Sequence, residues 1–192
     1  MIPSIALKRI FDVVISSIIC VLMAVPIILI ALAVKLTSKG PILYWSERVG
    51  QNNRIFRMPK FRSMKTDAPQ IATHLLNNPK SHLTPIGGVL RRSSVDELPQ
   101  LFSVLCGDLS LVGPRPALFN QYDLISLRSL HGVHNLIPGI TGWAQVNGRD
   151  DLSIAEKVLL DCEYLTKQSL LFDLKILGLT ILKIVRQEGV SH

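Results

Sequence analysis

VVISSIICVLMAVPIILIALAV, residues 13–34, is a run of 22 residues without a charged side chain. As a helix it would extend for roughly 30 Å, which is about the thickness of the hydrocarbon core of a bilayer. The run lacks the small-x-small cleavage site, followed by polar sequence, that ends a signal peptide. We therefore expect residues 1–39 to anchor the chain in a membrane and residues 40–192 to form one separate domain.

Basic residues lie on both sides of this apolar run. Lys8 and Arg9 precede it, and Lys35 and Lys39 follow it. Because a spanning helix usually has an excess of basic residues on one side only, these flanks favour a re-entrant hairpin whose two ends stay on the same face. Pro26, near the middle, can bend the helix. A single spanning helix with a mild kink remains the alternative.

The net charge of +7 is concentrated in the segment that follows the apolar run. Such a segment attracts anionic membrane lipids or a phosphorylated substrate. A nucleic acid would be the competing partner, but no helix-turn-helix, zinc or RNA-binding signature accompanies the charge, so we predict no nucleic-acid binding. One or two functional residues are expected among Arg48, Arg54, Arg57, Lys60, Arg62 and Lys65.

Three cysteines are scattered along the chain, and one of them lies inside the apolar run. Cys20, Cys106 and Cys162 do not have the spacing of a metal site, and their odd number argues against a disulfide framework. This usage is typical of a reducing compartment. We expect the domain to face the cytoplasm.

The segment after the anchor predicts a small β element followed by a helix. Short apolar runs alternate with basic residues from Pro41 to Met64 and predict strands or a hairpin around residues 50–53. Residues 66–85 are polar and contain three prolines, which predicts a loop with a short helix. From Asp96 to Cys106 the leucines have helical spacing, and Gly107 provides a stop.

The C-terminal half predicts three further helices. One covers residues 118–131, and a second begins at the capping-box pair Ser153 and Glu156 and runs to about Lys167. The last, residues 169–186, has a broad apolar face that is expected to pack on the domain, with the membrane interface as the alternative. The predicted fold class is α+β, predominantly helical with a small β element, a re-entrant membrane hairpin and membrane-interface helices.

Two adjacent carboxylates, Asp96 and Glu97, follow Arg91 and Arg92 at the start of the helix predicted from Asp96 to Cys106. A structural interpretation is that Asp96 caps the helix, or that Ser94 caps it while Glu97 completes a capping box. Phosphoryl chemistry is the functional interpretation. A carboxylate near a helix N-terminus and guanidinium groups stays ionised, as a nucleophile must, and a neighbouring carboxylate can hold Mg²⁺.

An arginine between two prolines strengthens the functional interpretation. Pro114 and Pro116 fix the backbone on both sides of Arg115, whose guanidinium suits a bidentate phosphate contact. Neither a Walker-type phosphate loop nor a dinucleotide fingerprint occurs in the chain, so standard nucleotide-binding folds are not expected.

Five motifs in order resemble the bacterial sugar transferase family, the monotopic polyprenyl-phosphate phosphoglycosyltransferases, in its minimal form. The resemblance covers nearly the whole chain. It differs from many members at Val25, where a serine usually precedes the proline, and at residues 118–122, which are less acidic than usual. The motifs are KRIFD (8–12), KFRSM (60–64), SVDELPQL (94–101), GDLSLVGPRP (107–116) and PGITGWAQVNGR (138–149).

The resemblance implies a two-step transfer. Asp96 would attack the β-phosphate of a UDP-sugar, release UMP and hold the phosphosugar, which undecaprenyl phosphate then accepts. Glu97 is implied as the Mg²⁺ ligand. The implied substrate-binding residues are Arg91, Arg115, Lys60, Arg62 and Arg149.

The resemblance also implies a place and a pathway. The anchor would be re-entrant in the bacterial inner membrane, with the catalytic domain on the cytoplasmic face, and the reaction would be the first membrane step in making an O-antigen, capsule, exopolysaccharide or other glycan. The sugar is not identified, and a homodimer remains open. A non-catalytic scaffold that binds anionic lipid is the competing hypothesis, but it leaves the carboxylate and proline–arginine motifs without a role.

Overall fold

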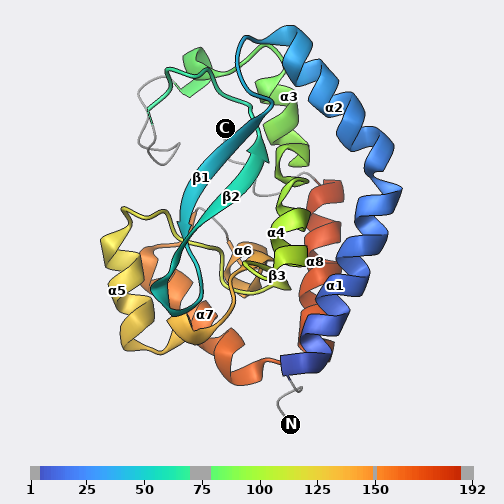
Figure 1. Cartoon of the computed structure of the whole chain (residues 1–192). Helices are drawn as coiled ribbons and strands as arrows, with labels where there is room; N and C mark the ends of the chain where they lie inside the picture. Colours follow the sequence, from blue (N-terminus) through green and yellow to red (C-terminus); the bar gives the residue numbers. More distant parts are fainter. Residues whose placement is uncertain (1–4, 70–78, 149–150, 187–192) are drawn as a thin grey trace.

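Two helices joined at a sharp bend form one side of the molecule (Figure 1). In the computed structural model, which describes residues 5–69, 79–148 and 151–186, α1 (Ile5–Leu22) and α2 (Ala24–Thr37) meet at 63°. Within these residues no single helix is long and apolar enough to cross a membrane, whereas the bent pair together meets that criterion. A re-entrant topology stays a prediction.

The bend has a local cause in Pro26. This residue lies in the first turn of α2, lacks an N–H group, and would press its ring against the carbonyl of Leu22 in a straight helix. Hydrogen bonds persist on both sides, from Met23 N to Ile19 O and from Ile27 N to Met23 O, each 2.8 Å. The predicted kink is therefore present, with a backbone hydrogen bond on each side of it.

The predicted hairpin is confirmed. Strands β1 (Leu43–Val49) and β2 (Ile55–Phe61) pair antiparallel around the short turn η1 (Gln51–Asn53). Asn52 and Asn53 adopt positive φ angles of 54° and 59°, which asparagine tolerates better than most residues.

The carboxylate pair lies on a tight turn between two short helices. After α3 (Gly87–Arg92), a 3₁₀ turn η4 (Val95–Glu97) precedes α4 (Gln100–Cys106). The helix expected from Asp96 therefore begins later, after Pro99, and both capping interpretations are wrong, because Ser94 makes no cap bond and adopts a φ of 55°. The stop at Gly107 is confirmed by its φ of 98°.

The C-terminal half contains the expected helices and a second small sheet. The helix expected at 118–131 is shorter, and the capping box of Ser153 and Glu156 is present at the start of α7. The fold is mainly helical with a small sheet component, as the sequence predicted. The remaining elements are η3 (Pro79–His82), β3 (Ser110–Val112), α5 (Tyr122–Leu130), η5 (Val133–Asn135), β4 (Gly139–Thr141), α6 (Trp143–Val146), α7 (Ile154–Lys167) and α8 (Leu170–Arg186), with β3 and β4 parallel.

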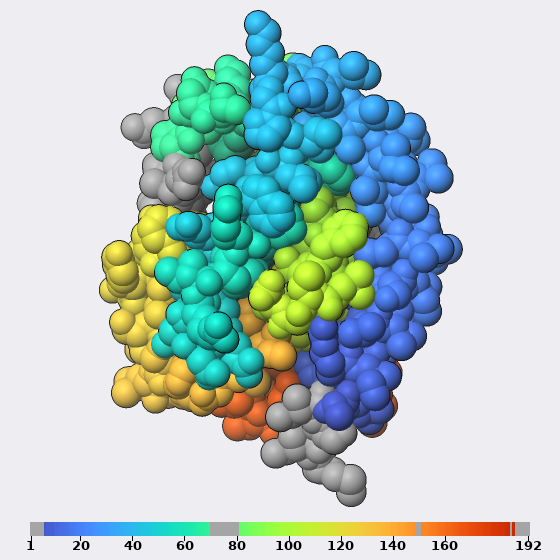
Figure 2. All heavy atoms as spheres, viewed as in Figure 1, coloured from blue at the N-terminus to red at the C-terminus, as the bar shows by residue number. Residues whose placement is uncertain are grey.

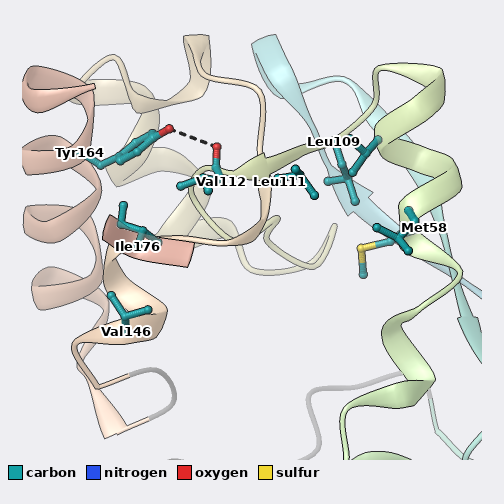
Figure 3. Close-up of a cluster of buried hydrophobic side chains, with 9 residues drawn as sticks. Met58, Leu109, Leu111, Val112, Val146, Tyr164 and Ile176 are labelled. Carbon is teal, nitrogen blue, oxygen red and sulfur yellow. Dashed lines mark hydrogen bonds between the residues drawn. The ribbon is translucent and has the colours of Figure 1, made fainter. Parts of the chain in front are cut away.

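The main core forms where β3 passes between α4, α7 and α8 (Figure 3). Tyr164 of α7 is 1% exposed, and its hydroxyl oxygen lies 3.1 Å from the carbonyl oxygen of Val112. Ile176 of α8 is completely buried against the same cluster. The expectation that α8 packs on the domain is correct for this side only, since Leu171 and Ile181 on the helix are 80% and 63% exposed.

Polar residues in the first half of α1 join the anchor to this core. Arg9 donates to the carbonyls of Val104 and Leu105 at the end of α4, where a cation complements the helix dipole. Asp12, 3% exposed, accepts a bond from the Leu111 N–H. Figure 2 shows α1 and α2 along one edge of the molecule, with α4 at the surface between them and the β-hairpin.

Candidate active site

Two cations hold Glu97 at the centre of the site. Lys60 Nζ, from β2, lies 2.7 Å from Glu97 Oε1, and Arg115 Nη2, from the loop after β3, lies 3.0 Å from the same oxygen. All three side chains are at most one-third exposed. The structure thus brings together three of the residues that the sequence selected, from three separate segments of the chain.

Asp96 lies beside this ion-paired group in a different environment. Its residue is 8% exposed, and within the residues that the structure describes its carboxylate accepts no hydrogen bond. The pair therefore presents one carboxylate that two cations contact and one, in a buried residue, that no other described residue hydrogen-bonds. Such a division of environments commonly separates the chemical roles of two adjacent acids.

The two carboxylates are shifted in opposite directions. Burial raises the pKa of Asp96, and the Glu97 charge adds to that increase, while Lys60, Arg91 and Arg115 oppose it. Burial also acts against the charged form of Glu97, but Lys60 and Arg115 hold its pKa well below the usual range. The sequence predicted that nearby arginines would keep Asp96 ionised, and the structure adds the competing cost of burial.

Positive charge exceeds negative charge at the site. Lys60 is buried enough that desolvation lowers its pKa, although Glu97 and Asp96 raise it. Arg91 at the end of α3 lowers the pKa of Asp96, so its charge also acts on the pair. With Arg115, at least three cations therefore face two carboxylates, which favours an anionic ligand such as a diphosphate.

Close backbone packing sets the start of the loop that carries Arg115. The Gly113 N–H donates to Thr141 O at 2.8 Å, and the Gly139 N–H donates to Pro114 O at 2.9 Å. A Cβ atom at Gly139 or Gly142 would collide with the backbone of Gly113, so only glycine allows this approach. The two glycine-rich motifs that the sequence singled out separately are therefore in direct contact.

Arg62, a predicted substrate-binding residue, does not contact the carboxylate pair. The Arg62 guanidinium donates to Ser38 and Lys39, at 2.6–2.9 Å, and so binds the chain just after α2. The residue is 4% exposed, and a role for it in substrate binding has no support in these contacts. Arg149 lies outside the described residues.

Arg48 is one of the six basic residues considered in the sequence, but it was not among the predicted substrate-binding residues. The structure places it near the site. Arg48 shares a face of the hairpin with Lys60, because both face the same side of the antiparallel register. Burial, and then Arg115, lower its pKa to about 10. Strand alternation could have identified it, since residues 44, 46 and 48 share one face of β1, but the face that meets the carboxylates was not evident from the pattern.

Magnesium is the ion that the carboxylates suit. Mg²⁺ is usually bound by one or two carboxylates together with substrate phosphates and water. Within the described residues no group of three or more acidic, histidine or cysteine side chains is gathered for a metal. Asp96, whose carboxylate accepts no hydrogen bond there, and the neighbouring Glu97 therefore fit a metal that is shared with a phosphate ligand, and not an all-protein metal site.

Comparisons with known proteins identify the family of the chain. A model of the bacterial sugar transferase family matches residues 3–187. The undecaprenyl-phosphate glucose phosphotransferase of Komagataeibacter xylinus is 43% identical over 187 residues, which cover 91% of this chain and 35% of that protein. The UDP-glucose:undecaprenyl-phosphate glucose-1-phosphate transferase of Escherichia coli (strain K12) is also 43% identical, with coverage of 92% and 40%.

A relative of similar length also matches. The uncharacterized sugar transferase EpsL of Bacillus subtilis (strain 168) is 40% identical over 186 residues, which cover 97% of this chain and 91% of EpsL. The chain therefore spans less than half the length of the first two relatives and nearly all of the third.

Proposed function

The chain belongs to the bacterial sugar transferase family, and on this premise we propose that it transfers a phosphosugar from a UDP-sugar to undecaprenyl phosphate. The names of the relatives from K. xylinus and E. coli support the donor and acceptor classes. The observation that carries the proposal is the carboxylate pair, in which Asp96 accepts no hydrogen bond within the described residues while Glu97 is bound by Lys60 and Arg115.

In the first step, an Asp96 carboxylate oxygen forms a bond to the β-phosphorus of the UDP-sugar. The bond from that phosphorus to the oxygen that bridges the two phosphates breaks, and UMP leaves with the electron pair. Arg115 and Lys60, which both contact Glu97, would stabilise charge on the phosphate oxygens. The raised pKa of Asp96 makes its carboxylate more basic, which favours attack once it is ionised.

In the second step, a phosphate oxygen of undecaprenyl phosphate attacks the same phosphorus. The bond between phosphorus and Asp96 breaks, which regenerates the carboxylate and yields undecaprenyl diphosphosugar. Glu97, with Asp96 beside it, would hold Mg²⁺, which would supply positive charge near the phosphates.

Membrane attachment follows from the anchor. The exposed side of the bent α1–α2 pair is apolar; Val21 and Val25, for example, are 76% and 65% exposed. We infer that this surface lies in the cytoplasmic membrane as a re-entrant hairpin, with the catalytic domain on the cytoplasmic face. That placement would bring the site to the surface where the phosphate of a polyprenyl lipid is found.

The test is UMP release from a panel of UDP-sugars, with undecaprenyl phosphate and Mg²⁺, by protein purified in detergent. The wild type should release UMP, and mass spectrometry after incubation with donor alone should find one added sugar-phosphate mass on the peptide that contains Asp96. Asp96→Asn should give neither signal, while Asp108→Asn, at an exposed position beyond α4, should behave like the wild type. Normal turnover by Asp96→Asn would refute the proposed nucleophile.

A further inference from the structure

The loop that presents Arg115 must be held almost entirely by its carbonyl groups. Pro114 and Pro116 have no N–H group, so the residues on both sides of Arg115 cannot donate backbone hydrogen bonds. The Arg115 side chain is 32% exposed, and its Nη2 lies 3.0 Å from Glu97 Oε1. The position of its guanidinium therefore depends on whatever donates to this loop.

Besides the Gly139 N–H, which donates to Pro114 O, three donors from outside the loop bind the next three carbonyls. Arg128 Nη1 donates to Arg115 O at 2.8 Å, Arg48 Nη1 donates to Pro116 O at 3.2 Å, and the Val49 N–H donates to Ala117 O at 2.9 Å. Of these three donors, Arg128 of α5 binds the carbonyl of Arg115 itself. None of the five sequence motifs includes Arg128.

Arg128 is in turn fixed by a buried acid of α7. Its Nε and Nη2 groups donate to Asp161 Oδ2 at 2.9 Å and 2.7 Å. The two side chains are 11% and 1% exposed, so the pair is shielded from water. α5 and α7 lie side by side in Figure 1, away from the anchor. Because a guanidinium is planar, fixing Nε and Nη2 also fixes the direction of the third nitrogen, Nη1, which here points to the Arg115 carbonyl.

We propose that Arg128, oriented by Asp161, is a positioning residue that fixes Arg115 against Glu97. It acts through the backbone of Arg115 and touches no substrate. The inference rests on the proposed function only for the role of Arg115 in binding the phosphosugar donor. The competing interpretation is a buried ion pair that stabilises the packing of α5 on α7 and has no effect on the site.

A double variant distinguishes the positioning role of Arg128 from a purely structural ion pair. Arg128→Met alone leaves Asp161 buried without its partner and should lower Tm, whatever the pair does. Arg128→Met combined with Asp161→Leu replaces the pair by apolar side chains and should recover most of that loss of Tm, because apolar replacements of buried ion pairs are often neutral. The double variant still lacks the donor to Arg115 O.

If Arg128 positions Arg115, the double variant should have a Tm close to that of the wild type and a kcat/KM for UMP release at least tenfold lower. The loss should appear partly as a raised KM for the UDP-sugar. Lys167→Gln, which breaks the exposed pair with Glu163 on α7, serves as the control and should change neither quantity. Recovery of kcat/KM together with Tm would overturn the proposal.

Hydrogen exchange gives a readout that does not depend on the reaction. The Gly113 and Leu118 amides, which donate to Thr141 O and Gln121 Oε1, should exchange faster in the double variant than in the wild type, whereas amides of α1 should not change. Unchanged exchange in the 113–118 segment would overturn the positioning role even if the wild type were active. Absence of UMP release by the wild type would instead count against the proposed function and leave the exchange result to decide this inference.

Discussion

The part of the chain that the structure describes contains two largely buried lysine–carboxylate pairs, and they differ in what surrounds them. Lys8 Nζ is 2.6 Å from Asp173 Oδ2 at the base of the anchor, and Lys60 Nζ is 2.7 Å from Glu97 Oε1 at the candidate active site. At the anchor, Tyr164 donates to the second oxygen of Asp173 at 2.8 Å, so both oxygens of that acid are used.

The active-site pair is not saturated in this way. Arg115 adds a second cation to Glu97, and the adjacent Asp96 is buried without a hydrogen bond among the described residues. The anchor pair satisfies its groups within the protein, whereas the active-site pair keeps a surplus of positive charge and one unbonded carboxylate. A structural ion pair and a ligand-binding ion pair can thus have similar nitrogen–oxygen distances. They differ in whether charged groups remain available to contact a ligand.

Loss of the anchor pair should have the largest effect on stability. Lys8→Met leaves Asp173 buried without its cation and should cost about 3–5 kcal/mol of unfolding free energy, with little change in kcat of the molecules that remain folded. Thermal unfolding in detergent measures the cost, with the exposed Lys39→Met as control. A Tm equal to that of the wild type would mean that the anchor pair is not structural.

Glu97→Gln tests the active-site pair. The change removes the charge that aligns Lys60 and Arg115, and UMP release should fall by about 10²–10³-fold, as when one preorganised electrostatic group is lost. Glu47→Gln is the matched control, because Glu47 is exposed on β1 and lies opposite Arg57 in the sheet. Equal activity in the two variants would show that Glu97 is not part of the site.

Asp96→Asn should have the smallest effect on stability, and in the opposite direction. Because burial raises the pKa of Asp96, its ionised form costs folding free energy at neutral pH, and that cost appears as pH rises from the ordinary value of 3.8 through the folded value. The variant should therefore be as stable as the wild type, or more stable, at pH 7.

The same comparison has a pH dependence. The gain in stability from Asp96→Asn should disappear below pH 3.8, where Asp96 is protonated in both the folded and the unfolded wild type. Thermal unfolding across this range measures it. A variant less stable than the wild type at pH 7 would show that the Asp96 charge is favourable in the folded protein.

Local patterns predicted much of the secondary structure. The hairpin, the capping box of α7 and the stop at Gly107 depend on a few neighbouring residues, and all three are present. The predicted start of this helix was wrong, because the carboxylates lie in η4 and α4 begins only after its N-cap residue, Pro99. Leucine spacing indicates a helical segment but does not locate its first residue.

The members of the site were only partly predictable. Asp96, Glu97, Lys60 and Arg115 were selected from the sequence, and three of these four meet at one oxygen of Glu97. Arg62, adjacent to a correct candidate, binds the chain after α2 instead. Lys60 and Arg62 are both cationic, and the sequence did not distinguish the one that contacts Glu97 from the one that binds the chain after α2. Tertiary packing decides between them.

By itself, the sequence determined the elements: an apolar run bent by a proline, a hairpin, helices with their caps, and a pair of carboxylates near basic residues. These follow from backbone geometry and spacing, which act over a few residues. The tertiary structure alone decided which charges meet. Glu97 joins Lys60 across 37 positions of sequence, and Lys8 joins Asp173 across 165, because burial makes unpaired charge costly wherever the chain brings such groups together.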